Sequence, residues 1–279
     1  DVSIISGLQV LENADKSKYN AFPVYVSRTG EWFVGEPLRD IALYERFDPN
    51  MKGLTKVIMP PVPGMNGLFA QKGVFGKFEK IAALDCALFA FHGMHGEDGA
   101  MQGLFELADV PYTSCGVISS AAGMDKIMMK AVFQSMGLPV LPGAWCYRDE
   151  WQKDPEAVIA RAEELKYPLF VKPSQLGSSI GISKAADRAG FIAAMEVACR
   201  FDWRILIEKG LESPDEINCA CLGLGDETEV SLCEQPVSWE TFLTFEQKYL
   251  KGNSGKGMEN LARKIPAPIG GELTARVQD

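Results

Sequence analysis

The strongest indication of chemistry lies between residues 170 and 184. A short apolar run there ends in Lys172, and the following turn carries two glycines and two serines, namely Gly177, Ser178, Ser179 and Gly181. The glycines are expected to let the backbone approach a ligand closely. An ammonium group beside hydroxyl and N–H donors suits a polyphosphate, whereas the alternative is an ordinary hairpin whose lysine extends to water. The lysine precedes the glycines, so the segment is not a P-loop.

A second candidate is a glycine-rich loop that contains both histidines of the chain, His92 and His95. With Glu97 and Asp98 they offer metal-ligating groups, but the loop lacks the rigid i, i+4 spacing of a helical zinc motif. We therefore prefer a hydrogen-bonding role toward a substrate. Asp98 is then expected to cap the N-terminus of the helix that follows.

Two Lys-containing pairs are unremarkable when taken alone. Asp125-Lys126 falls within a predicted helix at 117–136, where a solvated helix face is the simplest interpretation. Lys248-Tyr249 precedes a Gly- and Ser-rich stretch and is equally compatible with a surface loop.

Two carboxylates also bear on a nucleotide. Glu208 ends an apolar strand and Glu216 opens the next one. A single carboxylate at a strand end is usually structural. Two of them near a lysine-containing turn could accept hydrogen bonds from an adenine amino group and from ribose hydroxyls.

The elements that must position these residues follow from hydrophobic periodicity. Residues 1–120 alternate helices and strands, beginning with a helix at 2–13 and including a strand at 86–91 expected to be buried on both faces. This pattern predicts an α/β domain with a parallel sheet. The remainder ends in an antiparallel pair at 217–224 and 228–234, which predicts an α+β domain. The histidine loop falls at the carboxyl end of a strand, where ligands bind in open α/β sheets.

Composition excludes several classes of function. The net charge is −9 with a pI near 5.0, and Lys and Arg form no cluster, so we expect no nucleic-acid partner. No apolar run reaches the roughly 18 residues of a membrane span, and the first residues lack the basic region of a secretory signal. We therefore expect a cytoplasmic protein without a membrane partner.

The seven cysteines are odd in number and scattered, and they contain no Cys-x-x-Cys pattern. Most of them lie in apolar strand or helix contexts, where a free cysteine behaves as a small hydrophobe. We interpret them as reduced core residues.

In their order along the chain, these segments resemble the D-alanine–D-alanine ligases, members of the ATP-grasp superfamily. The resemblance rests on His-Gly-x-x-Gly-Glu-Asp-Gly-x-x-Gln-Gly-Leu-Phe-Glu-Leu from residue 92, Met-Asp-Lys at 124–126, Phe-Val-Lys-Pro-x-x-x-Gly-Ser-Ser-x-Gly from residue 170, Ile-Glu-Lys at 207–209 and Glu-x-Lys-Tyr at 246–249. It extends over the whole chain. The most specific parts are the histidine loop and the Gly-Ser-Ser turn.

The resemblance implies a role for each of several residues. ATP phosphates would be bound by Lys126, Lys172 and Lys248, with Ser178 and Ser179 folding over them. The adenine pocket would be lined by Glu208, Lys209, Leu211 and Phe242, and the ribose would be bound by Glu216. The first D-alanine would be bound by His92 and Ser3. The catalytic hydrogen-bonded triad would join Ser178 and Tyr249 to a glutamate that the family places ahead of Asp1.

The implied reaction joins two D-alanines into D-alanyl-D-alanine for peptidoglycan precursor synthesis. ATP would phosphorylate the carboxylate of the first D-alanine, and the amine of the second would attack this acyl phosphate. The resemblance also implies Mg²⁺ (or Mn²⁺) and a homodimer. Tyr249 favours D-alanine as the second substrate. The alternatives are a D-alanine–D-serine ligase and a nucleotide-binding pseudo-ligase without turnover.

The chain also departs from the family pattern. The expected Mg²⁺ ligands, an Arg-x-Asp strand and a Glu-x-Asn pair, do not occur in 251–279 and are expected beyond Asp279, so no metal ligand is assigned. The polypeptide is therefore expected to be truncated at both ends and inactive by itself. We divide it into a substrate-binding domain (1–120, first strand missing), a central ATP-grasp lobe (121–212) and an incomplete C-terminal lobe (213–279).

Overall fold

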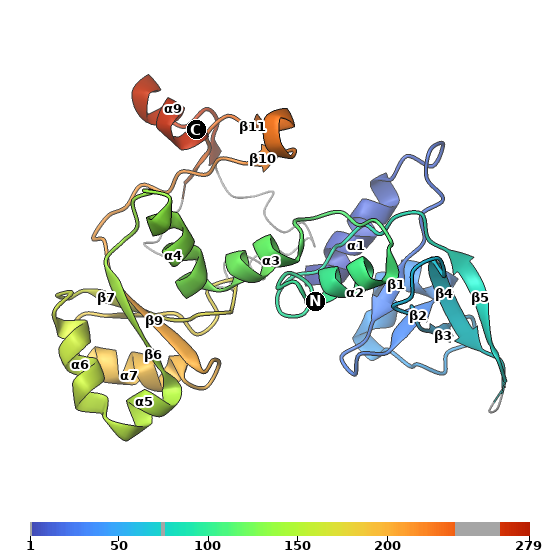
Figure 1. Cartoon of the computed structure of the whole chain (residues 1–279), viewed down its shortest axis with the longest axis horizontal. Coiled ribbons are helices and arrows are strands. Elements are labelled where there is room, and N and C mark those ends of the chain that lie inside the picture. Colours follow the sequence, from blue (N-terminus) through green and yellow to red (C-terminus); the bar gives the residue numbers. More distant parts are fainter. Residues whose placement is uncertain (1, 74–75, 238–262) are drawn as a thin grey trace. The chain divides into compact units, whose positions relative to one another are not determined.

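The computed structural model of the protein describes residues 2–73, 76–237 and 263–279. The chain divides into two compact units, Asp1–Met136 and Gly137–Asp279, and each is described by itself (Figure 1). The predicted three-part division of the chain stays a prediction. None of the helices in the described ranges is long and apolar enough to cross a bilayer.

The first unit opens with the predicted amphipathic helix and continues with short strands. Its elements are α1 (Val2–Asn13), β1 (Val24–Val26), β2 (Trp32–Val34), the 3₁₀ helices η1 (Glu36–Arg39) and η2 (Ile41–Arg46), β3 (Thr55–Val57), β4 (Gly67–Gln71), β5 (Phe78–Ala83), α2 (Ala100–Ala108), α3 (Val117–Met124) and α4 (Lys126–Ser135). The strands form an antiparallel sheet in the order β1-β2-β3 and a β4-β5 hairpin.

The core of the first unit forms where the apolar side of α2 meets the strands. Phe105 of α2 is buried with Leu68 of β4 and Val57 of β3. Phe89 packs edge-on to Phe105 at 4.9 Å and stacks on Tyr112 at 5.2 Å. Aromatic packing therefore fixes the segment that leads into the histidine loop.

The strand predicted at 86–91 is reduced to a bridge. Ala87 pairs in parallel with Tyr112, and this is the parallel pairing seen among the described residues of the unit. The N–H of Phe89 donates to the Thr113 side chain at 3.1 Å instead of to a backbone carbonyl, and this ends the ladder. Leu88 is 57% exposed, so the expectation of burial on both faces was wrong.

The second unit begins with a four-stranded antiparallel sheet in the order β6-β9-β7-β8. Its elements are β6 (Gly143–Tyr147), α5 (Arg148–Lys153), α6 (Pro155–Glu163), β7 (Leu169–Pro173), β8 (Ser183–Ala185), α7 (Arg188–Ala198), β9 (Arg204–Lys209), β10 (Cys221–Leu222), the 3₁₀ helix η3 (Gly225–Glu227), β11 (Glu229–Val230), β12 (Gln235–Pro236), β13 (Arg263–Lys264) and α9 (Gly271–Gln278).

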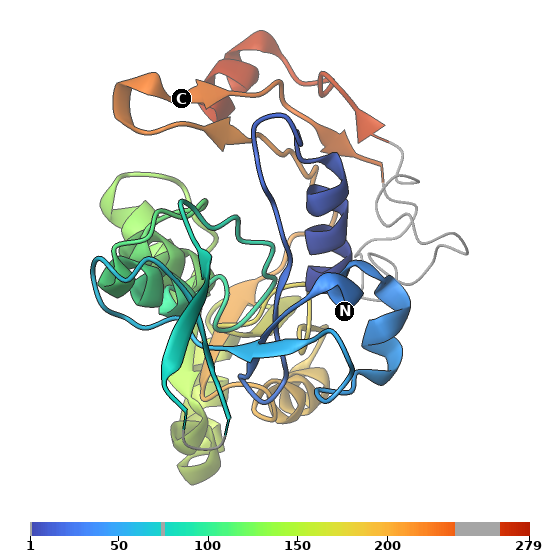
Figure 2. The ribbon, with the colours of Figure 1, turned by 90° about the vertical axis from the view of Figure 1, so that its right-hand side faces the viewer.

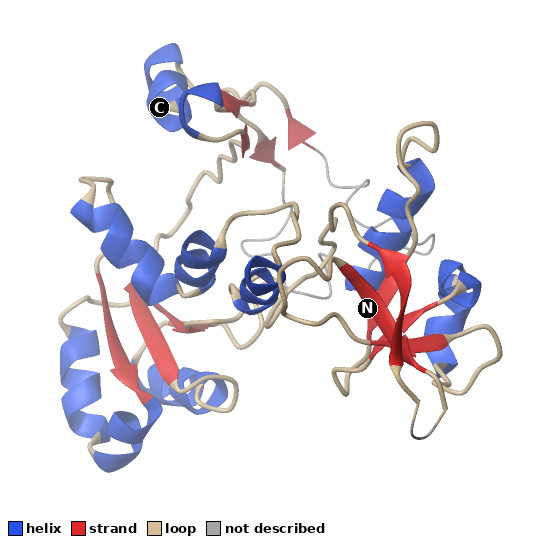
Figure 3. Cartoon of the chain, turned by 45° about the vertical axis from the view of Figure 1, so that its right-hand side comes forward, coloured by secondary structure: helices blue, strands red, loops and turns tan. Residues whose placement is uncertain are grey.

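Helices α5, α6 and α7 cover one face of this sheet (Figure 3). Side chains alternate along a strand, so Leu169 and Val171 of β7 and Ile205 and Ile207 of β9 point to the same side. They are at most 1% exposed and pack in one cluster with Phe191 of α7. The intervening residues of β7 and β9 must therefore lie on the other face.

The last part of the second unit is the predicted antiparallel pair, with α9 beside it (Figure 2). Strands β10 and β11 pair with each other, as do β12 and β13, and an isolated bridge joins Asn218 to Glu234. These are short elements with little burial.

Candidate active site

The face of the sheet opposite the helices carries the predicted charged residues. Lys172 lies opposite Leu206, and Phe170 lies opposite Glu208, so these four side chains share one face. Gly143 of the edge strand is the other neighbour of Glu208, and a side chain there would crowd the backbone of β9, because its Cβ would lie 2.9 Å from the Ile207 carbonyl oxygen. The sheet thus has an apolar face under the helices and, on the opposite side, a charged face that carries Lys172 and Glu208.

Lys172 and Glu208 form an ion pair across β7 and β9, diagonally between neighbouring positions. The side chain of Glu208 is only 7% exposed and that of Lys172 is 23% exposed. The ammonium also lies 5.7 Å from the centroid of the Phe170 ring. A carboxylate with so little solvent requires a partner, and Lys172 provides the positive charge.

The turn after Lys172 departs from regular backbone at its serines. Ser178 and Ser179 have φ values of 53° and 61°, a left-handed conformation that non-glycine residues rarely adopt, and Gly181 has a φ of 72°. Gly177 does not have a positive φ, so only Gly181 uses the backbone freedom of glycine; the close approach of both glycines to a ligand stays a prediction. Strained residues of this kind often mark ligand-binding turns.

The beginning of this turn is fixed by a buried carboxylate. Asp202 is 7% exposed and accepts hydrogen bonds from the backbone N–H groups of Gln175 at 2.8 Å and Trp203 at 2.7 Å. The N–H of the fully buried Ser174 donates to the Arg204 carbonyl at 3.0 Å. The left-handed serines therefore extend from an anchored stem.

The two glycines of the turn are expected to respond differently to alanine. A Cβ at Gly181 would lie 2.7 Å from Phe201 and 2.8 Å from Pro173, at a positive φ, whereas a Cβ at Gly177 would contact nothing within 4 Å. Gly181→Ala should lower the free energy of unfolding by about 1–3 kcal/mol. Gly177→Ala, the matched control, should change it by less than about 0.5 kcal/mol. Urea denaturation of both variants measures this, and equal effects would contradict the backbone geometry.

The residues after Glu208 are less enclosed. The Lys209 ammonium donates to the carbonyls of Lys166 at 2.9 Å and Tyr167 at 3.3 Å, so it is already hydrogen-bonded to the backbone of the protein. The role of Lys209 in an adenine pocket stays a prediction. Leu211 is 48% exposed and Glu216 is also exposed.

In the first unit, the structure brings Ser3 and His92 together. Ser3 Oγ accepts a hydrogen bond from the His92 N–H at 3.1 Å, and Ser6 Oγ lies 2.9 Å from His92 Nε2. Both serines lie on α1, 86 or more residues before the histidine. Helix α1 therefore holds the histidine loop in place.

The two acids of the histidine loop hold its backbone. Glu97 accepts from the Gly93 N–H, and Asp98 accepts from the N–H groups of His95 at 2.8 Å and Ala100 at 3.1 Å. Asp98 thus caps α2 from the position before its N-cap, which is Gly99. No group of three or more His, Cys, Asp or Glu suited to a metal occurs among the residues that the structure describes.

Gln102 lies in the helix after this loop, and the sequence reasoning quoted it in the motif but gave it no role. Its side chain is buried in α2, and its amide donates to the Gly96 carbonyl at 3.0 Å and to Ser114 at 3.4 Å. Its Oε1 atom has no hydrogen-bond partner among the described residues. The signal available in the sequence was a polar residue on the apolar side of this helix, next to buried Phe105 and Ala108 in the pattern.

The helix predicted at 117–136 is two helices, α3 and α4, separated by Asp125. Asp125 has extended backbone, and its carboxylate accepts from the N–H groups of Ile127 at 3.0 Å and Met128 at 3.1 Å. It is 4% exposed, so the interpretation as a solvated helix face was wrong. Lys126 is consequently the first residue of α4, where the N-cap fixes its position.

Replacing this N-cap is expected to be costly. Asp125→Ala removes the acceptor of two helix N–H groups and should lower the free energy of unfolding by about 1–2 kcal/mol. Asp125→Asn keeps an acceptor oxygen and should retain most of that stability. Chemical denaturation compares the variants. Equal losses in both would mean that the charge, rather than the cap, is what matters.

The predicted site residues fall into two groups and a remainder. Lys172, Glu208 and the serine turn lie in the second unit, while Ser3, His92 and Lys126 lie in the first. Three predicted residues lie outside the residues that the structure describes, namely Phe242, Lys248 and Tyr249.

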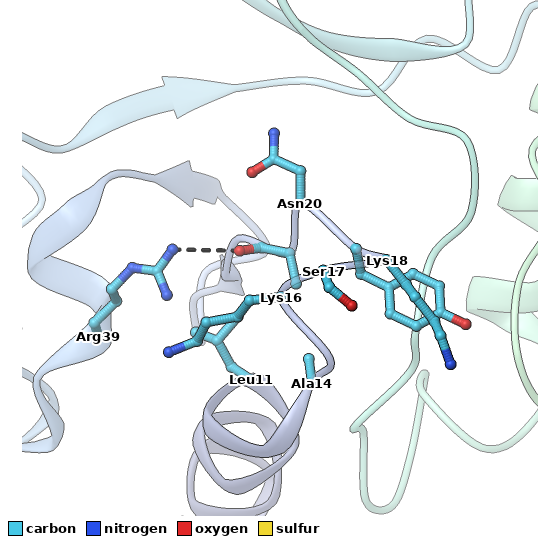
Figure 4. Close-up of a pocket in the computed structure, with 9 residues that line it drawn as sticks. Leu11, Ala14, Lys16, Ser17, Lys18, Asn20 and Arg39 are labelled. Atoms are coloured by element: carbon cyan, nitrogen blue, oxygen red, sulfur yellow. Dashed lines mark hydrogen bonds between the residues drawn. The ribbon is translucent and has the colours of Figure 1, made fainter.

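A surface hollow of about 500 Å³ lies at the C-terminal end of α1 (Figure 4). Two of the three cations that line it are paired with carboxylates, because Arg39 donates to Glu36 at 2.9 Å and Lys18 lies 3.5 Å from Asp15. Predicted site residues do not line it, and the helix end beside it favours cations rather than anions. We do not regard it as the active site.

Comparison with known proteins identifies the family. The family model described as D-ala D-ala ligase C-terminus matches residues 132–279, and that described as D-ala D-ala ligase N-terminus matches residues 1–115. The chain belongs to the D-alanine–D-alanine ligase family. The D-alanine–D-alanine ligase of Heliobacterium modesticaldum is 36% identical over 280 residues, covering 100% of this chain and 72% of the relative. That of Thermosipho melanesiensis is also 36% identical and is covered to 73%.

Solved structures of this ligase family share the fold. The VanG D-Ala:D-Ser ligase of Enterococcus faecalis matches with a TM-score of 0.77 and 29% identity, covering 99% of this chain and 75% of that one. The D-alanine–D-alanine ligase of Coxiella burnetii matches with a TM-score of 0.75, and at 23% identity it supports the fold alone. The chain therefore has the ATP-grasp fold of these ligases, with an N-terminal domain ahead of it.

Proposed function

We propose that this protein is an ATP-dependent ligase that joins two D-alanines into D-alanyl-D-alanine. The observation that carries the proposal is the charged face of the second unit, where Lys172 pairs with Glu208 ahead of a turn with two left-handed serines. This arrangement occurs in a chain whose relatives over its full length are D-alanine–D-alanine ligases.

The chemistry of the donors fits ATP. Lys172 offers a cation to phosphate oxygens, and Glu208 offers an acceptor to the adenine amino group. When bound, ATP would supply the phosphoryl group that activates the first D-alanine. Since Lys172 and Glu208 compensate each other in the structure, the nearly buried Glu208 keeps the ammonium in position until a more highly charged phosphate competes for it.

We assign the remaining ATP contacts on the resemblance. They are Lys126 at the capped start of α4, Ser179, Lys209, Leu211 and Glu216, together with Phe242 and Lys248. Ser178 and Tyr249 would act in catalysis. The turn bearing Ser178 would also exclude water, which would otherwise hydrolyse the activated carboxylate.

The first D-alanine is assigned to the loop around His92. The contacts from Ser3 and Ser6 hold both the backbone and the ring of this histidine. With its position fixed, the ring can donate a hydrogen bond to the substrate carboxylate. Mg²⁺ belongs to the proposal through the family alone, and no step is derived through it.

Phosphate release tests this function. The natural protein with ATP and Mg²⁺ should release phosphate when D-alanine is added and should form the dipeptide, as followed by mass spectrometry. Phosphate release without dipeptide would contradict the proposal. No release with any amino acid would also contradict it and would favour a nucleotide-binding protein without turnover.

D-serine as the second substrate is the competing function, because the VanG structure is named a D-Ala:D-Ser ligase. The same assay with D-alanine plus D-serine discriminates between the two functions. D-lactate, which has a hydroxyl in place of the amine, is tested as a third acceptor. We expect D-alanyl-D-alanine to be the main product. Cytoplasmic location and a homodimer stay predictions, the latter tested by light scattering of the purified protein.

A further inference from the structure

The cysteines of the chain differ strongly in their surroundings, and the prediction that most of them lie in the core was wrong. All seven are free, but Cys86, Cys115 and Cys221 are exposed. Burial raises the pKa of Cys146 to about 12 and that of Cys199 to about 11, so these two thiols remain protonated and unreactive near neutral pH. Two cysteines remain, and they lie together.

Cys219 and Cys233 face each other across an antiparallel pair of chain segments. Asn218 and Glu234 exchange both of their backbone hydrogen bonds, each at 2.8 Å. The next pair in this register is Cys219 with Cys233, which makes it a non-hydrogen-bonded pair. Cα atoms in such pairs lie about 4.5 Å apart, within the range that a disulfide spans. Burial raises the pKa of the Cys233 thiol, and the neighbouring Cys219 adds to that rise.

The strand register prevents the third cysteine of this segment, Cys221, from lying opposite Cys233. Beyond the cysteine pair, the N–H of Ser231 donates to the Ala220 carbonyl at 2.8 Å, which shifts the pairing by one residue. Cys221 therefore lies opposite Val230 in β10 and β11. A shift of this kind is a β-bulge, and here it selects which thiol Cys233 meets.

The two thiols also differ in accessibility. Cys233 is 1% exposed, and its carbonyl accepts from the Ala267 N–H at 2.7 Å, so it is covered by the chain near β13. Cys219 is half-buried, and its Sγ donates to the Ser231 carbonyl at 3.4 Å. A small oxidant can therefore reach Cys219 more easily than Cys233.

We propose that Cys219 and Cys233 are a redox-sensitive pair that hydrogen peroxide converts into an intramolecular disulfide. The Cys219 thiolate attacks a peroxide oxygen, the O–O bond breaks, and water leaves after protonation of the hydroxide. The resulting Cys219 sulfenic acid is attacked by the Cys233 sulfur. The S–S bond forms, a second water leaves, and each peroxide is reduced by the two electrons that the thiols lose.

The disulfide would restrain the segment that carries Glu216. The disulfide would join this segment to the one that leads into β12, and it would fix the register that the bulge sets. Formation of this disulfide does not depend on the ligase reaction, so it is tested separately from activity.

Peptide mapping of the natural protein tests the pair. Trypsin does not cut between 210 and 247, because this stretch lacks Lys and Arg, but a Glu-specific protease cuts after Glu216, Glu227, Glu229 and Glu234. After a peroxide pulse and alkylation of free thiols, we expect peptide 217–227 joined to peptide 230–234. The joined peptides should separate on reduction with dithiothreitol. Only alkylated, sulfinic or sulfonic forms of these peptides would overturn the proposal.

Two matched variants identify the partner of Cys233, because peptide 217–227 contains both Cys219 and Cys221. Cys221→Ser should retain the joined peptides, whereas Cys219→Ser should lose them. Both substitutions are nearly isosteric, and a far-UV spectrum checks that each variant folds. Joined peptides that persist in Cys219→Ser and vanish in Cys221→Ser would show that the register is wrong. In the wild type, the fragment spectrum of the joined peptide gives the same answer without any substitution.

Discussion

Lys172→Met is expected to lower kcat for phosphate release by about 100- to 1,000-fold, the usual effect of losing a group that stabilises charge in the transition state. It should also destabilise the second unit. The side chain of Glu208 is only 7% exposed and would lose the ammonium beside it. Breaking such a pair costs about 3–5 kcal/mol, and the lower end applies because Lys172 is 23% exposed.

A double variant separates these two effects. Lys172→Met with Glu208→Gln removes both charges, so the free energy of unfolding should recover most of its loss, whereas kcat should not. Urea denaturation and phosphate release are measured on the same preparations. Recovery of kcat together with stability would mean that Lys172 serves only to compensate Glu208, and it would remove Lys172 from the ATP site.

Ser178→Ala is expected to lower kcat by about 100-fold if its hydroxyl acts on the reacting groups, as the proposed triad requires. Ser178→Gly removes the same hydroxyl but relieves the left-handed backbone, at a φ of 53°, which costs a non-glycine residue about 1–2 kcal/mol. The two variants should therefore lose the same activity, and the glycine variant should be the more stable of the two.

The comparison distinguishes hydroxyl from backbone. Steady-state rates with saturating ATP and D-alanine give kcat, and thermal unfolding gives stability. If Ser178→Gly kept wild-type kcat while Ser178→Ala lost it, the conformation of the turn would be the functional feature. The assignment of Ser178 to the triad would then be wrong.

Local sequence signals predicted the elements that have strong periodicity. Helix α1 and strands β7 and β9 lie where apolar spacing and apolar runs placed them. The charged face also follows from such a pattern, since Lys172 and Glu208 alternate with buried neighbours. What the pattern lacks is the pairing itself: the two residues are 36 positions apart, and only the strand register brings them together.

Where the sequence misled, one tertiary interaction decided the outcome. The strand at 86–91 ended early because the Thr113 side chain took the N–H of Phe89. The left-handed serines could not be predicted, since composition places glycine rather than serine at positive φ. No role could be given to Gln102, although the quoted motif contains it, because its partner is a backbone group, the Gly96 carbonyl.

The break at Asp125 also determines how this part of the chain can move. Straightening α3 and α4 into one rod would take the N–H groups of Ile127 and Met128 away from the carboxylate and leave a nearly dehydrated anion without them. The angle between α3 and α4 is therefore expected to resist change, although a single extended residue joins the two helices. The backbone of Lys126, the first residue of α4, is held at this junction. Its ammonium is therefore expected to move through changes of its own rotamer or through displacement of both helices together.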